Sequence, residues 1–464
     1  MVHKRSLQTL VGLLTARGVI ALVSVGDPSD VIPPSDWAAD NAIVPDYNVP
    51  FPSVQPSNIV AKYVFDDNST SISHESFTVD ANDTSVILVT DGADLALSHV
   101  DVIKFGYSSN LDDASFWGFN AAINVANAST VDFNHLNITV HNGAANIYSY
   151  GSDTIVNVTD AWLYSSGPVS HGLYASGNGT IYGANLAHFS GGHRSSSFSG
   201  DSPKGIIHVR DSVAHAQGIG SATYYALGEI FADNVVSVSE QGPVVFMDGK
   251  QNVSLVNCDA TAGLLGGMVI FSSSIREAGA SISVADSRIA ANGSNMPGLW
   301  FGNVIADVDL RNTQLDTRSG VLVVANYSQV TQDFDYYASY TDNTDLSPAE
   351  VYITVSESSL VGDLIPYNES YISWNLTEYS TWSGATYSGY GTSYVDVALS
   401  SSSNWTLTAT SYIQNLTDAD ESLANIVSNG YTLYYNSSAL LNAWLGNRTI
   451  SLSGNGLLTP GTQS

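Results

Sequence analysis

The sequence has a single cysteine and few basic residues, and each shortage excludes a class of protein. One cysteine, Cys258, cannot form an intrachain disulfide, so the fold is not a disulfide scaffold. Only 14 Lys and Arg stand against 43 Asp and Glu, which leaves a formal net charge of −29. A chain this acidic repels nucleic acid and anionic membranes, so we expect neither as a partner. It also repels polyuronates unless a divalent cation bridges the two.

Long hydrophobic runs are equally scarce. Residues 1–25 have a basic start and an apolar stretch, interrupted by Arg17, which is the pattern of a signal peptide. No later run approaches the roughly 18 apolar residues that a membrane-spanning helix requires. We therefore expect no membrane span.

N-glycosylation acceptor sites of the form Asn-x-Ser/Thr (sequons) are abundant. The fifteen acceptors are Asn68, Asn82, Asn127, Asn137, Asn157, Asn178, Asn252, Asn292, Asn326, Asn368, Asn375, Asn404, Asn415, Asn436 and Asn447. This is about twice the number that chance would place in a chain of this composition. Together with the N-terminal segment, they predict a secreted, monomeric glycoprotein associated with the cell wall.

A repeat of about 25 residues runs through the middle of the chain. Each unit reads apolar–x–apolar–x and then a polar residue, usually Asn or Asp. The polar markers are His99, His135, Asp160, Asn185, Asp211, Asn234, Asn257, Asp286, Asn312 and Glu357. From His135 to Asn312 the steps are 25, 25, 26, 23, 23, 29 and 26 residues.

This period without a helical pattern predicts a solenoid of strands. Asn and Asp suit the corners of such a coil because they tolerate left-handed backbone. We predict an all-β, right-handed parallel β-helix of roughly a dozen coils, with the handedness usual for parallel strand connections. We expect an irregular cap over residues 26–85, the solenoid over 86–456 with an insertion loop at about 327–350, and a tail over 457–464.

The first candidate site is the stretch KFGYSSNLDDASFWGFN, which lengthens one repeat. Asn110, Asp112 and Asp113 offer the hard oxygen ligands that calcium prefers. Trp117 and Asn120 follow and could contact a sugar. The alternative is a solvated loop whose aromatic residues pack on the barrel.

The second candidate is GGHRSSSFSGDSPKG, which concentrates Arg194, Asp201 and Lys204 in a Gly/Ser-rich corner. A polysaccharide lyase needs a base beside the uronate and a cation on its carboxylate. A long structural turn explains the same residues. The Gly-His-Gly element typical of solenoid polygalacturonases is missing from the sequence, which counts against that type of hydrolase.

Aromatic residues gather in the last quarter of the chain, including Trp374 and Trp382. On a strand face they could form a flat platform for sugars, or they could be ordinary core packing.

Several stretches resemble a known group of proteins. SSNLDDASFWGFNAAINV, SHGLYASGNGT, VVFMDGKQNVSL and the closing SNGYTLYYNSSALLNAWLGNRTISLSGNG are similar to secreted right-handed β-helix proteins of the bacterial and fungal carbohydrate-binding-domain group. The resemblance spans roughly residues 85–456. It implies a pectate-lyase-like fold, binding of cellulose or acidic sugars, and bound calcium. The chain departs from the bacterial pattern at Gly200–Gly205, which puts a carried-over site there in doubt.

Three functions follow from these observations. The first is binding of an extended extracellular polysaccharide, either cellulose-like or an acidic-sugar polymer, with calcium as the candidate ion. The second is a polysaccharide lyase or glycoside hydrolase on the same fold, and the third is a structural or adhesive surface glycoprotein. Fold alone does not choose between them, although the first fits the charge and the resemblance best.

Overall fold

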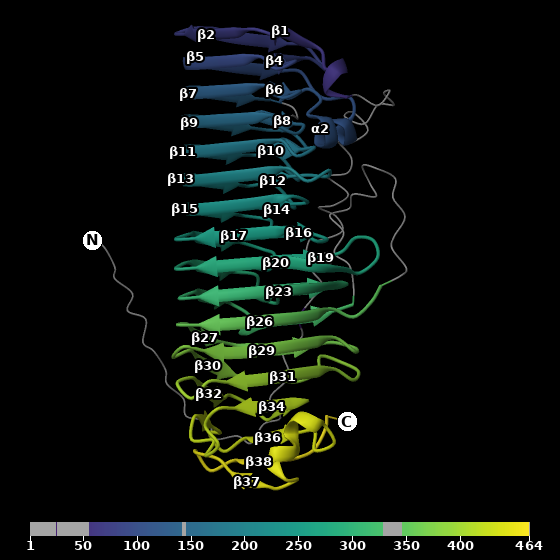
Figure 1. Cartoon of the computed structure of the whole chain (residues 1–464), viewed down its shortest axis with the longest axis vertical. Helices are drawn as coiled ribbons and strands as arrows, with labels where there is room; N and C mark the ends of the chain where they lie inside the picture. Colours follow the sequence, from purple (N-terminus) through teal and green to yellow (C-terminus); the bar gives the residue numbers. More distant parts are fainter. Residues whose placement is uncertain (1–24, 26–54, 142–144, 328–345, 464) are drawn as a thin grey trace, which may run out of the picture.

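The sequence repeat corresponds to successive coils of a parallel β-solenoid in the computed structural model, which describes residues 25, 55–141, 145–327 and 346–463 (Figure 1). The solenoid has about 15 turns, close to the dozen expected, and almost no helix. The predicted parallel β-helix is therefore confirmed. Residues 1–24, which hold most of the expected signal peptide, and 328–345, which hold most of the expected insertion, lie outside the described residues.

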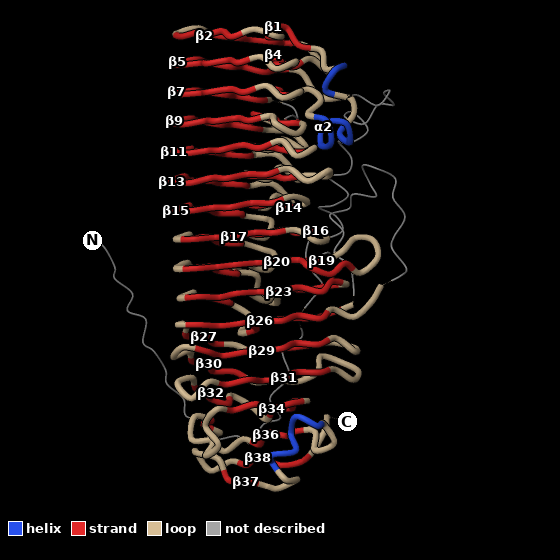
Figure 2. The backbone as a smooth tube through the Cα atoms, in the orientation of Figure 1, coloured by secondary structure: helices blue, strands red, loops and turns tan. Residues whose placement is uncertain are grey.

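One strand of each coil belongs to a 12-stranded sheet (Figure 2). In sheet order its strands are β1 (Ala61–Asp66), β4 (Ser85–Thr90), β6 (Ile123–Ala126), β8 (Ile147–Tyr150), β10 (Leu173–Ser176), β12 (Phe198–Gly200), β14 (Tyr224–Ala226), β16 (Val245–Asp248), β19 (Met268–Phe271), β22 (Leu299–Gly302), β25 (Val321–Asn326) and β28 (Asp363–Pro366).

The rest of each coil forms a second set of parallel strands. They are β2 (Ser69–Ser73), β3 (Ser76–Asp80), β5 (Asp94–Phe105), β7 (Thr130–Val140), β9 (Ile155–Ser165), β11 (Thr180–Ser190), β13 (Ile206–Ala216), β15 (Glu229–Ser239), β17 (Asn252–Val256), β18 (Asp259–Ala262), β20 (Glu277–Ala285), β21 (Arg288–Ala291), β23 (Val304–Arg311), β24 (Gln314–Thr317), β26 (Glu350–Ser356), β29 (Tyr371–Thr377), β31 (Tyr394–Leu399) and β34 (Asn415–Asp418).

Two smaller sheets complete the C-terminal part. The first contains β27 (Ser359–Val361), β30 (Thr381–Gly384), β32 (Asn404–Leu407) and β35 (Ile426–Val427). The second contains β33 (Ser411–Ile413), β36 (Thr432–Tyr435), β38 (Leu457–Pro460) and β37 (Ile450–Ser451). The described helices are α2 (Leu111–Trp117) and the 3-10 helices η3 (Pro56–Asn58) and η4 (Leu440–Leu445).

The polar markers of the repeat are the corners of the coils. Every marker from His99 to Glu357 has a positive φ, between 44° and 56°. The side chains continue from coil to coil: the rings of His99 and His135 stack with centroids 4.6 Å apart, and Asn234 Nδ2 donates to Asp211 Oδ1 at 2.8 Å. His74 and Glu378 occupy the same conformation and extend the row beyond the predicted series.

Alternation along the strands puts one set of side chains inside the coil. Val131, Val156, Ile181, Ile207 and Ile230 pair in register on β7, β9, β11, β13 and β15, and all are fully buried. Each coil therefore extends one continuous hydrophobic core, in which stacked apolar side chains stabilise the fold.

The solenoid covers more of the chain than the sequence indicated. β1, β2 and β3 lie within the stretch expected to be an irregular cap, and β38 lies within the expected tail. The sequence repeat is weak at both ends, because β2 has Ile72 as its only apolar residue and because η4 and β37 interrupt the repeat before β38.

Candidate functional site: the post-corner face

Each coil bends at its corner residue, and we call the strand after the bend the post-corner segment. Its outward side chains stack in rows down the solenoid. The first row, two residues after each corner, is Trp162, Ala187, Val213, Val236, Asp259, Arg288 and Gln314. The second row is Tyr164, Phe189, His215, Val238, Thr261, Ala290 and Asp316. We call these two rows, continued to Ser359 on β27, the post-corner face.

The half of this face from β9 to β15 is apolar. Trp162, Val213, Val236 and Val238 have 49%, 51%, 53% and 39% of their surface exposed, although a protein normally buries such side chains. In the second row, the Tyr164 and Phe189 rings stack with centroids 5.9 Å apart. Exposed apolar side chains on β9, β13 and β15, joined by the partly exposed Ala187 and Phe189 of β11, form a continuous patch, which is the kind of surface that marks an interaction site.

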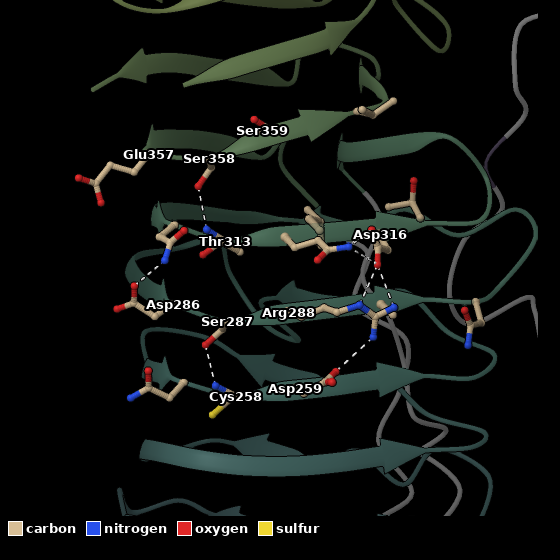
Figure 3. Close-up of a pocket in the computed structure, with 18 of the residues that line it drawn as sticks. Cys258, Asp259, Asp286, Ser287, Arg288, Thr313, Asp316, Glu357, Ser358 and Ser359 are labelled. Atoms are coloured by element: carbon tan, nitrogen blue, oxygen red, sulfur yellow. Dashed lines mark hydrogen bonds and ion pairs between the residues drawn. The ribbon is translucent and has the colours of Figure 1, made fainter. Parts of the chain in front are cut away.

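The half from β18 to β27 is a polar groove of about 1080 Å³ (Figure 3). Its lining includes Asp259, Arg288, Gln314, Asp316 and Ser359. These side chains come from four stacked coils, so the groove runs along the solenoid axis.

A break in strand stacking is associated with the groove. β24 pairs with β21, whereas β27 pairs with β30 in a different sheet. Ser358 Oγ accepts a hydrogen bond from the Thr313 amide at 2.8 Å and links the two coils beside the corner. Beyond that link the two strands diverge into separate sheets, and residues of both strands line the groove.

Arg288 is the central charged group of the groove. Its Nη1 contacts Asp259 Oδ1 at 3.2 Å on the preceding coil, and its Nε donates to Asp316 Oδ2 at 2.9 Å on the following one (Figure 3). Burial disfavours the guanidinium charge, but the hydrogen bonds to Asp259 and Asp316 outweigh this effect and raise the pKa of Arg288. The guanidinium therefore stays charged and fixes the position of both carboxylates.

A second charged cluster lies at the corner side of the groove. Arg311 pairs with Asp286 and lies 3.8 Å from Glu357, and Asn312 Nδ2 donates to Asp286 Oδ1 at 2.8 Å. Hydrogen bonds from Asn312 and Arg311 lower the pKa of Asp286 despite some desolvation. The groove thus presents fixed carboxylate and amide groups, an arrangement that can hydrogen-bond the hydroxyls of a polyol.

The pre-corner segments carry a second, shallower depression of about 470 Å³, lined in part by Tyr182, His208 and Phe231. These rings stack on each other, with centroids 4.8 and 4.7 Å apart and interplanar angles of 10° and 11°. This depression has less than half the volume of the groove, so we take the post-corner face as the principal candidate site.

No family model, curated protein or solved structure matches this chain. In the part of the chain that the structure describes, no helix is long and apolar enough to span a membrane.

The tryptophans expected to form a sugar platform lie in the core. Trp374 and Trp382 are 0% and 1% exposed, and Trp382 stacks on Trp405 with centroids 4.7 Å apart. Trp382 Nε1 donates to the Gly362 carbonyl at 2.8 Å. Their strands turn these side chains inward, next to Ile372 and Leu376, so they cannot contact a polymer on the surface.

The residues proposed for calcium begin and cap a helix. Asn110 is the N-cap of α2: its Oδ1 accepts from the Asp113 amide at 3.0 Å, and its Nδ2 donates to Asp113 Oδ2 at 3.0 Å. The Asp112 side chain lies outside the described residues. Elsewhere in the described chain, no group of three or more His, Cys, Asp or Glu is placed to hold a metal ion.

The sugar-contacting residues proposed beside that helix have structural partners. Asn120 is buried, accepts from the Thr84 amide at 3.1 Å and donates to the Gly106 carbonyl at 3.3 Å. Trp117 is partly buried, and its ring packs against the Tyr150 ring with centroids 5.1 Å apart.

The proposed lyase residues are spread along one coil. Arg194 precedes β12 and Asp201 follows it, and both are 3% exposed. Asp201 accepts a hydrogen bond from the buried Tyr174 hydroxyl, and Lys204 pairs with Glu229 of the next coil. Arg194 and Asp201 are therefore buried in the coil, whereas Lys204 lies in the exposed turn after β12.

Sequence reasoning missed the post-corner face. The signal was the second residue after each corner marker, which changes from apolar at Val213 and Val236 to charged at Asp259 and Arg288. This change from apolar to charged residues becomes visible when the repeats are aligned on their corner markers.

Proposed function

We propose that the protein binds an extended polysaccharide along the post-corner face, with the groove around Arg288 as the principal site. The observation that carries this proposal is the groove itself, which offers hydrogen-bonding side chains from four consecutive coils. Polar side chains presented at about 4.8 Å intervals along a rigid axis suit a polymer better than a small molecule.

Charge supports a neutral polymer over a polyuronate. The groove lining contains the carboxylates of Asp259, Asp286, Asp316 and Glu357 and the guanidinium groups of Arg288 and Arg318. The carboxylates outnumber the cations in a chain of net charge −29. A cellulose-like chain is therefore preferred among the two polymer classes that we expected.

Exposure of the sequons supports secretion. None of the fifteen sequon asparagines is buried. Among the other described asparagines, six are buried: Asn120, Asn124, Asn146, Asn303, Asn425 and Asn442. The acceptor sites are thus confined to positions that a glycosyltransferase can reach, which supports an extracellular glycoprotein.

Depletion from solution tests the function. Purified protein is incubated with a panel of insoluble neutral and acidic polysaccharides, with calcium and with a chelator, and bound protein is measured with reducing ends and unsaturated uronate products. We expect saturable depletion by a neutral polymer without products. Product formation would favour the lyase or hydrolase, and neither depletion nor products would leave the structural glycoprotein.

A further inference from the structure

The fifteen sequons are distributed unevenly over the surface. Four lie in the turn between the 12-stranded sheet and the pre-corner segment: Asn68, Asn127, Asn178 and Asn368. Asn326 ends β25 of that sheet, and Asn436 lies between β36 and η4. Asn252 begins β17, and three more lie on pre-corner segments, namely Asn157, Asn375 and Asn415. The turns after the post-corner segments carry Asn82 and Asn292, and Asn447 is near the C-terminus.

Sequons on post-corner strands occur only near the two ends of the solenoid. Asn137 lies on β7, directly before Trp162 in the first row, and Asn404 lies on β32, beyond β27 and β30. The post-corner segments of the coils between them carry no sequon. This stretch contains the whole apolar half and the strand residues of the groove. One sequon asparagine, Asn292 in the turn after β21, does line the groove.

Charge is also nearly absent from the apolar half. Its two rows from β9 to β15 contain no Asp, Glu, Lys or Arg, and His215 contacts Glu240 at 2.6 Å at the margin. In an acidic, sequon-rich chain, a long outward face that lacks both features is unexpected for a surface exposed only to water.

We propose that N-glycans cover the turns and pre-corner segments and leave the post-corner strands from β9 to β27 bare, and that this whole face, not the groove alone, binds the polymer. The inference rests on the proposed function and extends it. The occupant is a neutral polysaccharide whose apolar ring faces lie on Trp162, Val213, Val236 and Val238 and whose hydroxyls reach the groove. The two halves are continuous, because the same two rows of side chains run through both, so one polymer can contact both halves. The apolar half carries almost no charge, which favours a neutral polymer over an anionic one.

A glycan placed on the apolar half tests the proposal. Val236→Asn combined with Val238→Thr creates a sequon on two exposed positions of β15, away from the groove. The matched control is Val236→Asn with Val238→Ala, which changes the same side chains but lacks the acceptor threonine. Both variants and the wild type are expressed in a secretory eukaryotic host, and peptide masses before and after enzymatic deglycosylation report which sites carry glycan.

We expect the added glycan to weaken polymer binding by at least about tenfold. The control measures the effect of the two side-chain changes alone, so the loss caused by the glycan is taken relative to the control. Deglycosylation of the glycan-bearing variant should restore binding to the level of the control, which shows that the variant is folded. Removing the native glycans should not weaken wild-type binding. A glycan-bearing variant that binds like the wild type would overturn the proposal, as would native sequons that carry no glycan.

If the proposed function is wrong, the wild type itself will bind no polymer. This result differs from failure of the present inference, in which the wild type binds polymer and the added glycan has no effect. A wild-type dimer that becomes monomeric in the glycan-bearing variant would assign the face to a second copy of the chain and also overturn the proposal. If the variant is not secreted, Trp162→Ala replaces it, and unchanged polymer binding by that variant would contradict the proposal.

Discussion

Arg288 Nε donates to Asp316 Oδ2 at 2.9 Å, joining the post-corner segments of two consecutive coils. The same guanidinium contacts Asp259 of the coil before. The Arg288 side chain therefore links the three coils of β18, β21 and β24. The next strand, β27, belongs to a different sheet. These contacts fix the positions of polar groups that line the groove.

Removing Arg288 should weaken polymer binding. Arg288→Ala deletes charge-assisted hydrogen bonds and leaves two carboxylates without their cation, an effect of about 1.5–3 kcal/mol, or roughly tenfold to a hundredfold in affinity. Arg288→Lys keeps the charge but not the fork of donors, so we expect an intermediate loss. Depletion isotherms measure both. Arg210→Ala is the matched control, since Arg210 pairs with Asp211 outside the groove and should leave binding unchanged.

Two tryptophans should separate binding from stability. Trp382→Ala removes a fully buried ring and should destabilise its coils by about 3–5 kcal/mol. Trp162→Ala removes a half-exposed ring and should change stability by about 0.5 kcal/mol or less while weakening polymer binding. Hydrogen exchange of β27, β30 and β32 reports the local stability. If Trp382→Ala lowered affinity with exchange unchanged, Trp382 would belong to the binding surface after all.

The corner conformation should discriminate between Ala and Gly. Asn234 has a φ of 54° and donates to Asp211. Asn234→Gly loses only the hydrogen bond, whereas Asn234→Ala also places a Cβ in left-handed backbone, which costs about 1–2 kcal/mol more. The midpoint of chemical denaturation should therefore be lower for the Ala variant than for the Gly variant. Equal midpoints would mean that the corner is not strained.

Acid should destabilise the solenoid through two buried histidines. Burial lowers the pKa of His171 and of His188 to about 3, so the folded state keeps both neutral where the unfolded state takes up protons. His171 Nδ1 accepts from the Ser196 amide at 3.0 Å, a bond that protonation would break. Stability is then full above about pH 6.5, the ordinary pKa of histidine, and is lost as the pH falls toward 3.

Asp248 acts in the opposite direction. Burial raises its pKa to about 6, so the folded state holds a proton that the unfolded state releases, and stability decreases as the pH rises from about 4 to 6. The raised pKa values of Asp363 and Asp418 act in the same direction as that of Asp248, whereas the lowered pKa values of Asp211, Asp286 and Asp420 act with the histidines. The two histidines have the largest shifts of pKa among these groups, so the net slope should follow them. Denaturation midpoints from pH 3 to 8 test this, and His188→Asn should flatten the slope. A midpoint that rises on acidification would contradict the assignment.

The corners could be predicted from sequence because their backbone restricts the residue type. Left-handed φ favours Asn and Asp, and the regular spacing of Asp160, Asn185 and Asp211 made the row visible. Glu357 was placed correctly because the apolar alternation before it was intact. The ends of the solenoid were not recognised for other reasons. The strand before the His74 corner, β2, has Ile72 as its only apolar residue, and η4 and β37 interrupt the repeat before β38.

The direction in which a side chain points was harder to predict than its position in the repeat. Trp374 alternates with Ile372 and Leu376, which indicates an inward side chain, but tryptophan alone suggests a sugar platform equally well. The groove could not be predicted from the sequence, for a different reason. It exists because β24 and β27 belong to different sheets, and that break depends on how coils stack in space.

Hydrogen exchange of the protein with and without saturating polymer tests the central claim most directly. Peptides covering the post-corner segments from β9 to β27 should be protected, most strongly at Asp259, Arg288 and Asp316, while the pre-corner segments exchange as in the free protein. Protection centred on the pre-corner row of Tyr182, His208 and Phe231, or on the 12-stranded sheet, would contradict the account.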